Sequence, residues 1–159
     1  MLTQFRKGFR RFLRREDGTQ MIEFAIVFPV LILLFAGVTE LGRLFHTYTS
    51  LAKATRSGAR YLSTVPNVAN STTAAKNIVM CGSAGGCGGQ DQPAIIVPNL
   101  TVNNIVITPP PAGTAAVKYV TVEITGYTYQ PAVFNLNAMT GSTFNFALRP
   151  STTMRYMPN

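Results

Sequence analysis

Residues 18–38 of the chain read GTQMIEFAIVFPVLILLFAGV, and no other stretch of the sequence is as apolar over this length. From Phe24 to Val38 there is no charged or strongly polar side chain. With the apolar residues on either side, the run approaches the roughly 20 residues that a helix needs to cross the hydrocarbon core of a bilayer. We therefore predict one membrane-spanning helix near the N-terminus.

Glu23 interrupts this apolar stretch near its start. A lone carboxylate costs about 2.5–3.5 kcal/mol or more at membrane depth and less near the boundary. Two interpretations stay open. Either Glu23 marks the membrane edge and reaches water, or processing or assembly supplies a partner for its charge.

A basic arm precedes the apolar stretch. Residues 5–15, FRKGFRRFLRR, carry six cations and no acid, and are either a short amphipathic helix on an anionic membrane surface or a disordered positive stop. A secretory signal peptide also joins a basic stretch to an apolar one, but its cleavage site follows the apolar block. No small-x-small site follows Val38. Cleavage at Gly18 would instead remove the arm and keep the apolar helix as the new N-terminus.

This arrangement resembles a type IV prepilin, with a basic leader that ends at Gly18, Thr19 as the first mature residue, Glu23 as the fifth, and Phe24 after it. The fuller pattern looks like the TadE-like pseudopilins of tight-adherence (Flp, type IVc) pilus systems. The resemblance is close over residues 18–62 and loose elsewhere. The further strings that carry it are ELGR at 40–43, SGAR at 57–60 and STTMR at 151–155.

The resemblance implies a minor pilin-like structural subunit, processed after Gly18 and assembled through its N-terminal helix into an adhesion pilus, or at its base or tip. The implied partners are the inner membrane, a prepilin peptidase, other pilins or pseudopilins, and the pilus assembly platform. Glu23 and Phe24 would act in assembly. The alternative is a permanently membrane-anchored extracytoplasmic binding or scaffold module of a secretion apparatus, which has no reason to lose its leader.

The net charge of +8 predicts topology better than it predicts a nucleic-acid partner. Residues 1–18 hold six cations and two acids, whereas residues 61–159 hold four cations and two acids. A nucleic-acid binder would concentrate positive charge on its folded domain. The positive-inside rule instead keeps the leader in the cytoplasm. We expect a single-pass protein of a bacterial inner membrane with a periplasmic C-terminal domain, present at the cell surface once assembled.

We predict an α+β fold with a leader at 1–18, a transmembrane and spine helix at 19–62, and a small extracytoplasmic domain at 63–159. Pro29 should bend the helix, because it removes the hydrogen bond to the Ala25 carbonyl. Beyond the membrane, apolar positions recur every three or four residues and form one stripe on which the domain packs. Its members are Leu41, Leu44, Phe45, Tyr48, Leu51, Ala52, Thr55, Ala59 and Leu62.

The domain is expected to contain a short helix and three or four antiparallel strands. Ser71 or Thr72 should cap the helix, and Gly82 should end it. Residues 131–141 are interpreted as a connection, either irregular or with a turn of helix. The predicted strands are 100–108, 117–129 with Val120, Val122 and Ile124 facing away from Tyr127 and Tyr129, and 143–148, which resumes beyond Pro150 to Tyr156.

Both cysteines, Cys81 and Cys87, lie in one glycine-rich loop. Two thiols without a nearby histidine make a poor zinc site, and the spacing is not CxxC. If the domain is outside the cytoplasm, a disulfide is the natural state. Such a small loop would stabilise the fold by roughly 2–2.5 kcal/mol on the chain-entropy model.

No catalytic, metal-binding or cofactor-binding motif is found in the sequence, so we expect neither an enzyme nor a small-molecule substrate. His46, the only histidine, is interpreted as a helix surface residue. Lys53, Arg56 and Arg60 form a row at helical spacing. Such a row is usually a solvated face, although in a filament it could meet acidic groups of a neighbour.

Overall fold

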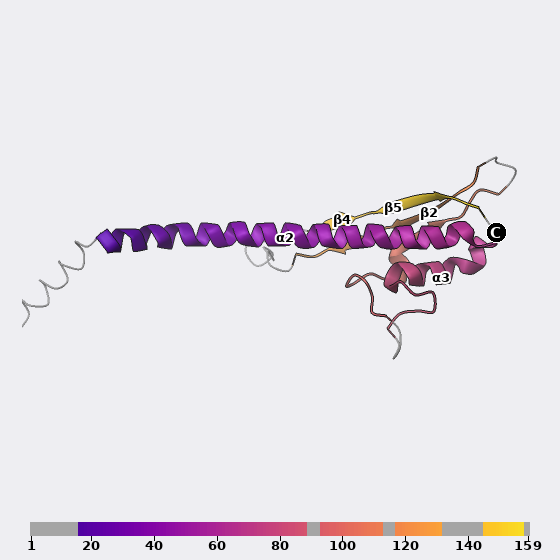
Figure 1. The fold of residues 1–159 in the computed structure, drawn as a ribbon, viewed down its shortest axis with the longest axis horizontal. Helices are drawn as coiled ribbons and strands as arrows, with labels where there is room; N and C mark the ends of the chain where they lie inside the picture. The colour runs from indigo at the N-terminus through magenta and orange to yellow at the C-terminus, as the bar shows by residue number, and fades with distance from the viewer. Residues whose placement is uncertain (1–15, 89–92, 113–116, 132–144, 158–159) are drawn as a thin grey trace, which may run out of the picture. The chain divides into compact units, whose positions relative to one another are not determined.

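The computed structural model describes residues 16–88, 93–112, 117–131 and 145–157. The chain divides into two compact units, residues 1–41 and 42–159, and each is described by itself. Helix α2 (Glu16–Thr64) is the only element of the first unit within the described residues, and its C-terminal part belongs to the second unit (Figure 1). Residues 1–15 of the predicted leader and most of the connection at 131–141 lie outside the described residues.

Helix α2 extends slightly beyond its predicted limits, from Glu16 instead of Thr19 and to Thr64 instead of Leu62. It ends where Pro66 follows, since a proline disfavours helical backbone in the residue before it. The helix continues through Pro29. A bend at Pro29 stays a prediction.

The second helix, α3 (Val68–Cys81), starts earlier than the sequence pattern indicated. Its N-cap is Asn67, whose side-chain oxygen accepts hydrogen bonds from the backbone N–H groups of Ala69 and Asn70. The prediction that Ser71 or Thr72 caps this helix is therefore wrong, because Asn67 already satisfies the free N–H groups of the first turn. Gly82 ends the helix as predicted, in the left-handed conformation (φ 78°) that favours glycine.

Within the described residues, five short strands form two antiparallel sheets and confirm the predicted α+β class. The first sheet has the order β1-β2-β5, with β1 at Ile105–Thr108, β2 at Tyr119–Ile124 and β5 at Ser151–Arg155. The second pairs β3 (Tyr127–Tyr129) with β4 (Phe146–Leu148). A 3-10 turn, η1 (Val102–Asn104), occupies the start of the predicted first strand.

The predicted strand 117–129 is broken into β2 and β3 by one extra residue. Glu123 pairs with Ser151, and Tyr127 pairs with Leu148. Between these two pairs, the three residues 124–126 lie opposite the two residues 149–150. Gly126 takes a positive φ of 70° at this bulge. Asn104 holds the neighbouring backbone, since its carbonyl accepts from the Thr125 N–H at 2.7 Å and its side-chain amide donates to the Thr125 carbonyl at 3.1 Å.

The bulge reverses which side chains are buried. In β2, Val120, Val122 and Ile124 are fully buried, as predicted. Beyond Gly126 the alternation shifts by one residue, so Tyr127 and Tyr129 are buried as well. The expectation that both tyrosines face away from the valines is therefore wrong, because it assumed an unbroken strand.

The core of the second unit packs on the C-terminal part of α2, alongside α3 and strands β2 and β5 (Figure 1). Leu51, Thr55, Ala59 and Leu62 are fully buried, which confirms the distal half of the predicted stripe. The proximal half is wrong for Leu41, Phe45 and Tyr48, which are exposed. The buried residues that the pattern missed on this helix are Ala54, Gly58 and Ser63.

Gly58 is the point where α2 lies closest to its neighbours. A Cβ atom at this position would lie 2.5 Å from Cγ2 of Val79 in α3, 3.5 Å from the Ala75 carbonyl oxygen, and 3.8 Å from Cγ1 of Val122 in β2. Both valines are fully buried, so neither has free space to move into. The absence of a side chain at Gly58 therefore allows the helix, its neighbour and the sheet to meet.

The last described residues fasten the chain to the end of α2. The Tyr156 hydroxyl lies 2.9 Å from the carbonyl oxygens of both Val65 and Pro66. The Met157 N–H donates to the Ser63 carbonyl, and the Tyr156 N–H donates to the Lys118 carbonyl. The carbonyls at the C-terminus of a helix have no intrahelical donors, so these contacts supply partners for the turn that follows α2.

We predict that Gly58→Ala destabilises the second unit. Overpacking a filled core costs about 1–3 kcal/mol, which outweighs the up to about 1 kcal/mol that alanine gains over glycine in a helix. Gly42→Ala is the matched control on the same helix, because nothing lies within 4 Å of its added Cβ. Thermal unfolding of the detergent-purified protein, followed by circular dichroism, should show a lower Tm for Gly58→Ala and an equal or higher Tm for Gly42→Ala. A Gly58→Ala protein as stable as the Gly42→Ala control would contradict the close contact.

Candidate functional site

The predicted cleavage and assembly residues all lie near the start of α2. Gly18 is half-buried, and Thr19, Glu23 and Phe24 are exposed. The bond between Gly18 and Thr19 lies close to Glu16, the first residue of α2 that the structure describes.

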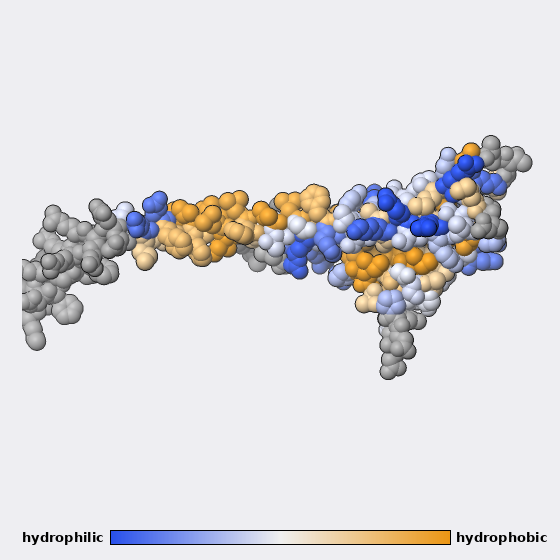
Figure 2. All heavy atoms as spheres, viewed as in Figure 1, coloured by the Kyte–Doolittle hydropathy of each residue, from blue (hydrophilic) through white to orange (hydrophobic). Residues whose placement is uncertain are grey.

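The helix surface after Glu23 is apolar and uncovered. Eleven large apolar side chains between Phe24 and Val38 are 44–74% exposed, and the Phe24 and Phe28 rings stack at 5.2 Å between centroids. Figure 2 shows this part of α2 as a continuous hydrophobic surface on the visible face. By length and composition, the helix is a candidate to cross a membrane, and its most apolar window has no buried residue within the described chain.

Removing this apolar surface from water would release a large amount of free energy. Full burial of one large apolar side chain is worth about 1.5–3 kcal/mol. If covering these half-exposed side chains gains only about 1 kcal/mol each, the sum is about 10 kcal/mol, comparable to the ~5–15 kcal/mol stability of a whole domain. The surface therefore needs lipid or another protein to cover it.

The Glu23 carboxylate is exposed and forms no ion pair with any residue that the structure describes. The nearest cationic residues in the sequence are Arg15 and Arg43, both far beyond the four-residue reach of a helical side-chain pair. The chain itself thus offers no cation of its own on the neighbouring turns. A partner for Glu23 has to come from outside the described helix or from a newly formed N-terminus.

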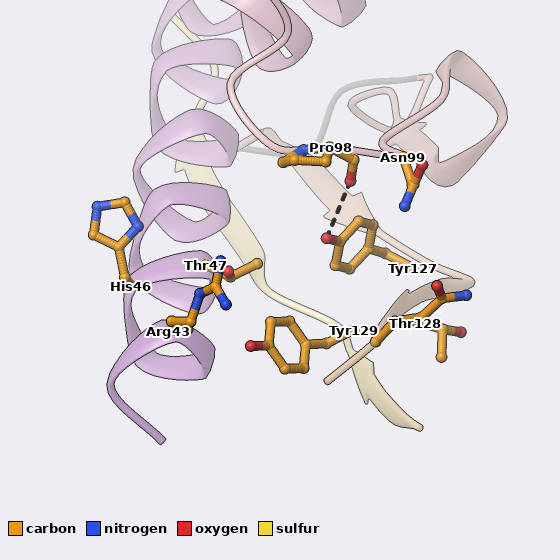
Figure 3. Close-up of a pocket in the computed structure, with 9 residues that line it drawn as sticks. Arg43, His46, Thr47, Pro98, Asn99, Tyr127, Thr128 and Tyr129 are labelled. Carbon is orange, nitrogen blue, oxygen red and sulfur yellow. Dashed lines mark hydrogen bonds between the residues drawn. The ribbon is translucent and has the colours of Figure 1, made fainter. Parts of the chain in front are cut away.

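A cavity of about 300 Å³ lies in the second unit between α2 and the strand β3. In Figure 3 the Tyr127 hydroxyl points to the Pro98 carbonyl and donates to it at 3.2 Å, while Arg43 and Thr47 of α2 face Tyr129. Burial raises the pKa of Tyr127, which keeps its phenol neutral and able to donate. The other lining residues are His46, Asn99, Thr128 and Gln130.

This cavity offers polar contacts but no acid–base pair. Its described lining holds no carboxylate and no thiol, and Figure 3 shows the His46 ring turned away from the tyrosines. No local sequence pattern predicts this cavity, since its lining comes from three segments about 30 to 55 residues apart. Asn99 has a positive φ of 63°, a conformation that asparagine tolerates better than most residues. Within the described residues, no group of three metal-binding side chains is found.

The structure joins Cys81 and Cys87 by a disulfide at the C-terminus of α3. The bridge closes a glycine-rich loop in which Gly86 and Gly88 have positive φ angles. Around it, the Ile96 N–H donates to the Met80 carbonyl at 2.8 Å and the Gly88 N–H donates to the Pro93 carbonyl at 3.2 Å. The disulfide therefore holds a segment that has little regular structure of its own.

Comparison with known proteins gives one match. Residues 18–60 match a protein-family model described as TadE-like protein. No curated protein and no solved structure matches the chain. The matched segment contains Gly18, Thr19, Glu23 and Phe24, and it ends within α2, four residues before Thr64.

We predict that replacing both cysteines by serine lowers the free energy of unfolding by roughly 2–2.5 kcal/mol, because the unfolded chain loses its small covalent loop. Denaturant unfolding of the wild type and of the double variant measures this difference. The matched control is Ser83→Ala, which lies in the same loop and leaves the bridge intact. In protein taken from native membranes, alkylation should find two thiols after reduction and none before it. Two free thiols before reduction would contradict the oxidised state.

Proposed function

We propose that this chain, whose residues 18–60 match the TadE-like family model, is a minor pilin-like structural subunit of a tight-adherence pilus. In this proposal a prepilin peptidase cuts after Gly18, the helix is stored in the bacterial inner membrane, and assembly carries it into a pilus or to its base or tip. The observation that carries the proposal is the uncovered apolar surface of α2, which begins five residues after the proposed cut.

The exposed apolar surface of α2 supports a role in assembly, because it can be buried first in a lipid bilayer and later in a bundle of helices. A lipid bilayer covers apolar side chains on all sides of a single helix. A bundle of like helices covers them equally well, since apolar contact is not directional. Gly37 and Gly42 have no atoms near their missing side chains, so nothing in the described chain hinders close approach of a second helix.

Charge and redox state support an extracytoplasmic second unit. The six cations of residues 5–15 lie on the N-terminal side of the apolar helix, and the positive-inside rule keeps such clusters in the cytoplasm. The disulfide between Cys81 and Cys87 suits the periplasm, where disulfides persist, better than the cytoplasm, where they are reduced. Both arguments assign the two sides of the membrane in the same way.

The folded second unit supports a minor role over that of the main filament subunit. It has its own core, its own disulfide and a polar cavity, none of which is needed to pack helices in a filament. A subunit that carries such a domain is better suited to a tip, a base or an adaptor position. In each of these positions one face of the domain stays available for contacts. We propose a structural role and no catalytic one.

We predict that the peptidase removes residues 1–18 in the native host. The mature mass should correspond to a chain that begins at Thr19, and N-terminal sequencing should read Thr-Gln-Met-Ile-Glu. Gly18→Phe should block the cut, because a bulky side chain keeps the peptidase from the backbone at that bond. Gly37→Ala is the control, since it alters a glycine of the same helix away from the bond. A wild-type chain that keeps its full mass beside an active peptidase would favour the permanently anchored module.

We further predict that Glu23→Gln leaves insertion, processing and folding near normal but reduces co-assembly with partner pilins. Cleavage creates an α-amine on Thr19, whose unperturbed pKa is about 7.7–8.0. An amine and a carboxylate in hydrocarbon are each costly alone, and pairing lowers the cost. In a bundle, the amine of one subunit can meet Glu23 of its neighbour and fix the axial register.

Pull-down of partner pilins from detergent-solubilised membranes measures this effect. Gln20→Glu is the matched control, because it places a second carboxylate on the same helix but at another axial position. Equal recovery of partners by the wild type and by Glu23→Gln would leave Glu23 as a residue of the membrane boundary.

A further inference from the structure

Three cations form one row on the outer face of α2 in the second unit. Lys53, Arg56 and Arg60 are all exposed. At 3.6 residues per turn they lie within roughly 60° of one another around the helix, on the side opposite the buried Leu51 and Leu62. Figure 2 shows strongly hydrophilic side chains gathered over this part of α2 on the visible face. We call these three residues the cationic row.

The cationic row has no acidic partner within the described structure. The sequence contains no Asp or Glu between residues 41 and 90, and no described side chain forms an ion pair with the row. Like charges three or four residues apart destabilise a helix by about 0.2–0.5 kcal/mol per pair. A single Glu at Thr49 or Ala52, four residues before a cation, would remove the conflict. A local arrangement that opposes stability in this way is the kind expected at a functional surface.

We propose that the cationic row docks an acidic helix of an extracytoplasmic partner protein. The rise per residue is about 1.5 Å, so the row spans roughly 10 Å, with steps of about 4.5 and 6 Å. Carboxylates at i, i+3 or i+4, and i+7 on a helix lying alongside α2 have the same spacing. That the partner is extracytoplasmic depends on the proposed function. That the partner is an acidic helix is inferred from the cationic row alone.

Three other occupants fit less well. A membrane-surface helix needs large apolar anchors beside its cations, and between residues 49 and 64 the described α2 exposes none. A second copy of this chain is a poor partner, because residues 42–159 hold eight cations and two acids. Single-stranded nucleic acid binds to cations combined with stacking aromatic rings, and no large aromatic side chain is exposed next to the row.

A zero-length carbodiimide cross-link tests the proposal on the full-length protein in native membranes. The reagent joins a lysine amine directly to a carboxylate, and Lys53 is the only lysine of the row. We expect mass spectrometry to find Lys53 coupled to an Asp or Glu in a helical segment of another protein, with further acids three or four residues away. Lys53→Arg should keep non-covalent recovery of that protein while removing the cross-link.

A charge-reversed double variant, its matched control and a third variant that stabilises the helix complete the test. The double variant Arg56→Glu/Arg60→Glu should lower the cross-link yield about tenfold or more, as expected when close charge pairs of an interface are reversed. Lys118→Glu/Arg155→Glu is the matched control, with the same change of net charge on the sheet, and should alter the yield less than about twofold. Thr49→Glu gives Lys53 an intrahelical partner, so it should raise the Tm slightly and still lower the yield.

The outcomes separate this inference from the proposed function. A coupled partner found with an uncut leader would support the row and contradict the pseudopilin proposal. Several results would overturn the inference, whatever the state of Gly18. They are a Lys53 cross-link only to Glu123 or Asp91 of another copy, cross-links from Lys76 and Lys118 but none from Lys53, or equal yields in the two charge-reversed double variants. Binding of the row to a polyanionic oligonucleotide or to anionic vesicles, without the cross-link, would overturn it as well.

Discussion

At Gly58 the backbone of α2 comes into contact range of Val79 in α3 and Val122 in β2, and the packing of the second unit depends on this approach. Two helices and a strand meet in one small volume there, which only a residue without a side chain allows. The buried residues Leu51, Thr55, Ala59 and Leu62 lie on the same side of the helix and cover the sheet on either side of this point. The Thr55 hydroxyl lies 3.0 Å from the Thr152 hydroxyl of β5, so the outer strand is tied to the same face.

Helix α2 carries two kinds of surface along its length, and they have different consequences. In the second unit one side of the helix is buried and the opposite side is polar, as in any helix that packs on a sheet. In the first unit the helix carries only apolar side chains from Phe24 to Val38, and most of them are exposed. The folded domain is therefore stabilised by contacts within the chain. The apolar side chains in the first part of α2 are removed from water only when lipid or another protein surrounds them.

The sequence predicted the types of the helices and strands better than it predicted which of their side chains are buried. The long helix, the end of α3 at Gly82 and the alternation of β2 each follow from a local rule, and the structure confirms them. The burial of Tyr127 and Tyr129 does not follow from any local rule. It depends on one extra residue at Gly126, next to Thr125, which is hydrogen-bonded to Asn104 from another part of the chain. The cavity beside these tyrosines was not predicted either, because it forms only through tertiary contacts between distant segments.

The family match and the folded domain divide the chain in an informative way. The TadE-like segment, residues 18–60, covers most of α2 and includes Glu23, Gly58 and the cationic row, but none of the strands. The matched segment of this chain therefore holds an apolar part, a point of close packing and an exposed charged face, all on one helix. The sheets, the disulfide loop and most of the cavity lining lie outside the match. Arg43 belongs to the matched helix and also lines the cavity, so any ligand of the cavity would contact both parts of the chain. It follows that the likeness to the TadE-like model is best studied in α2, and that residues 61–159 hold the features that this likeness does not explain.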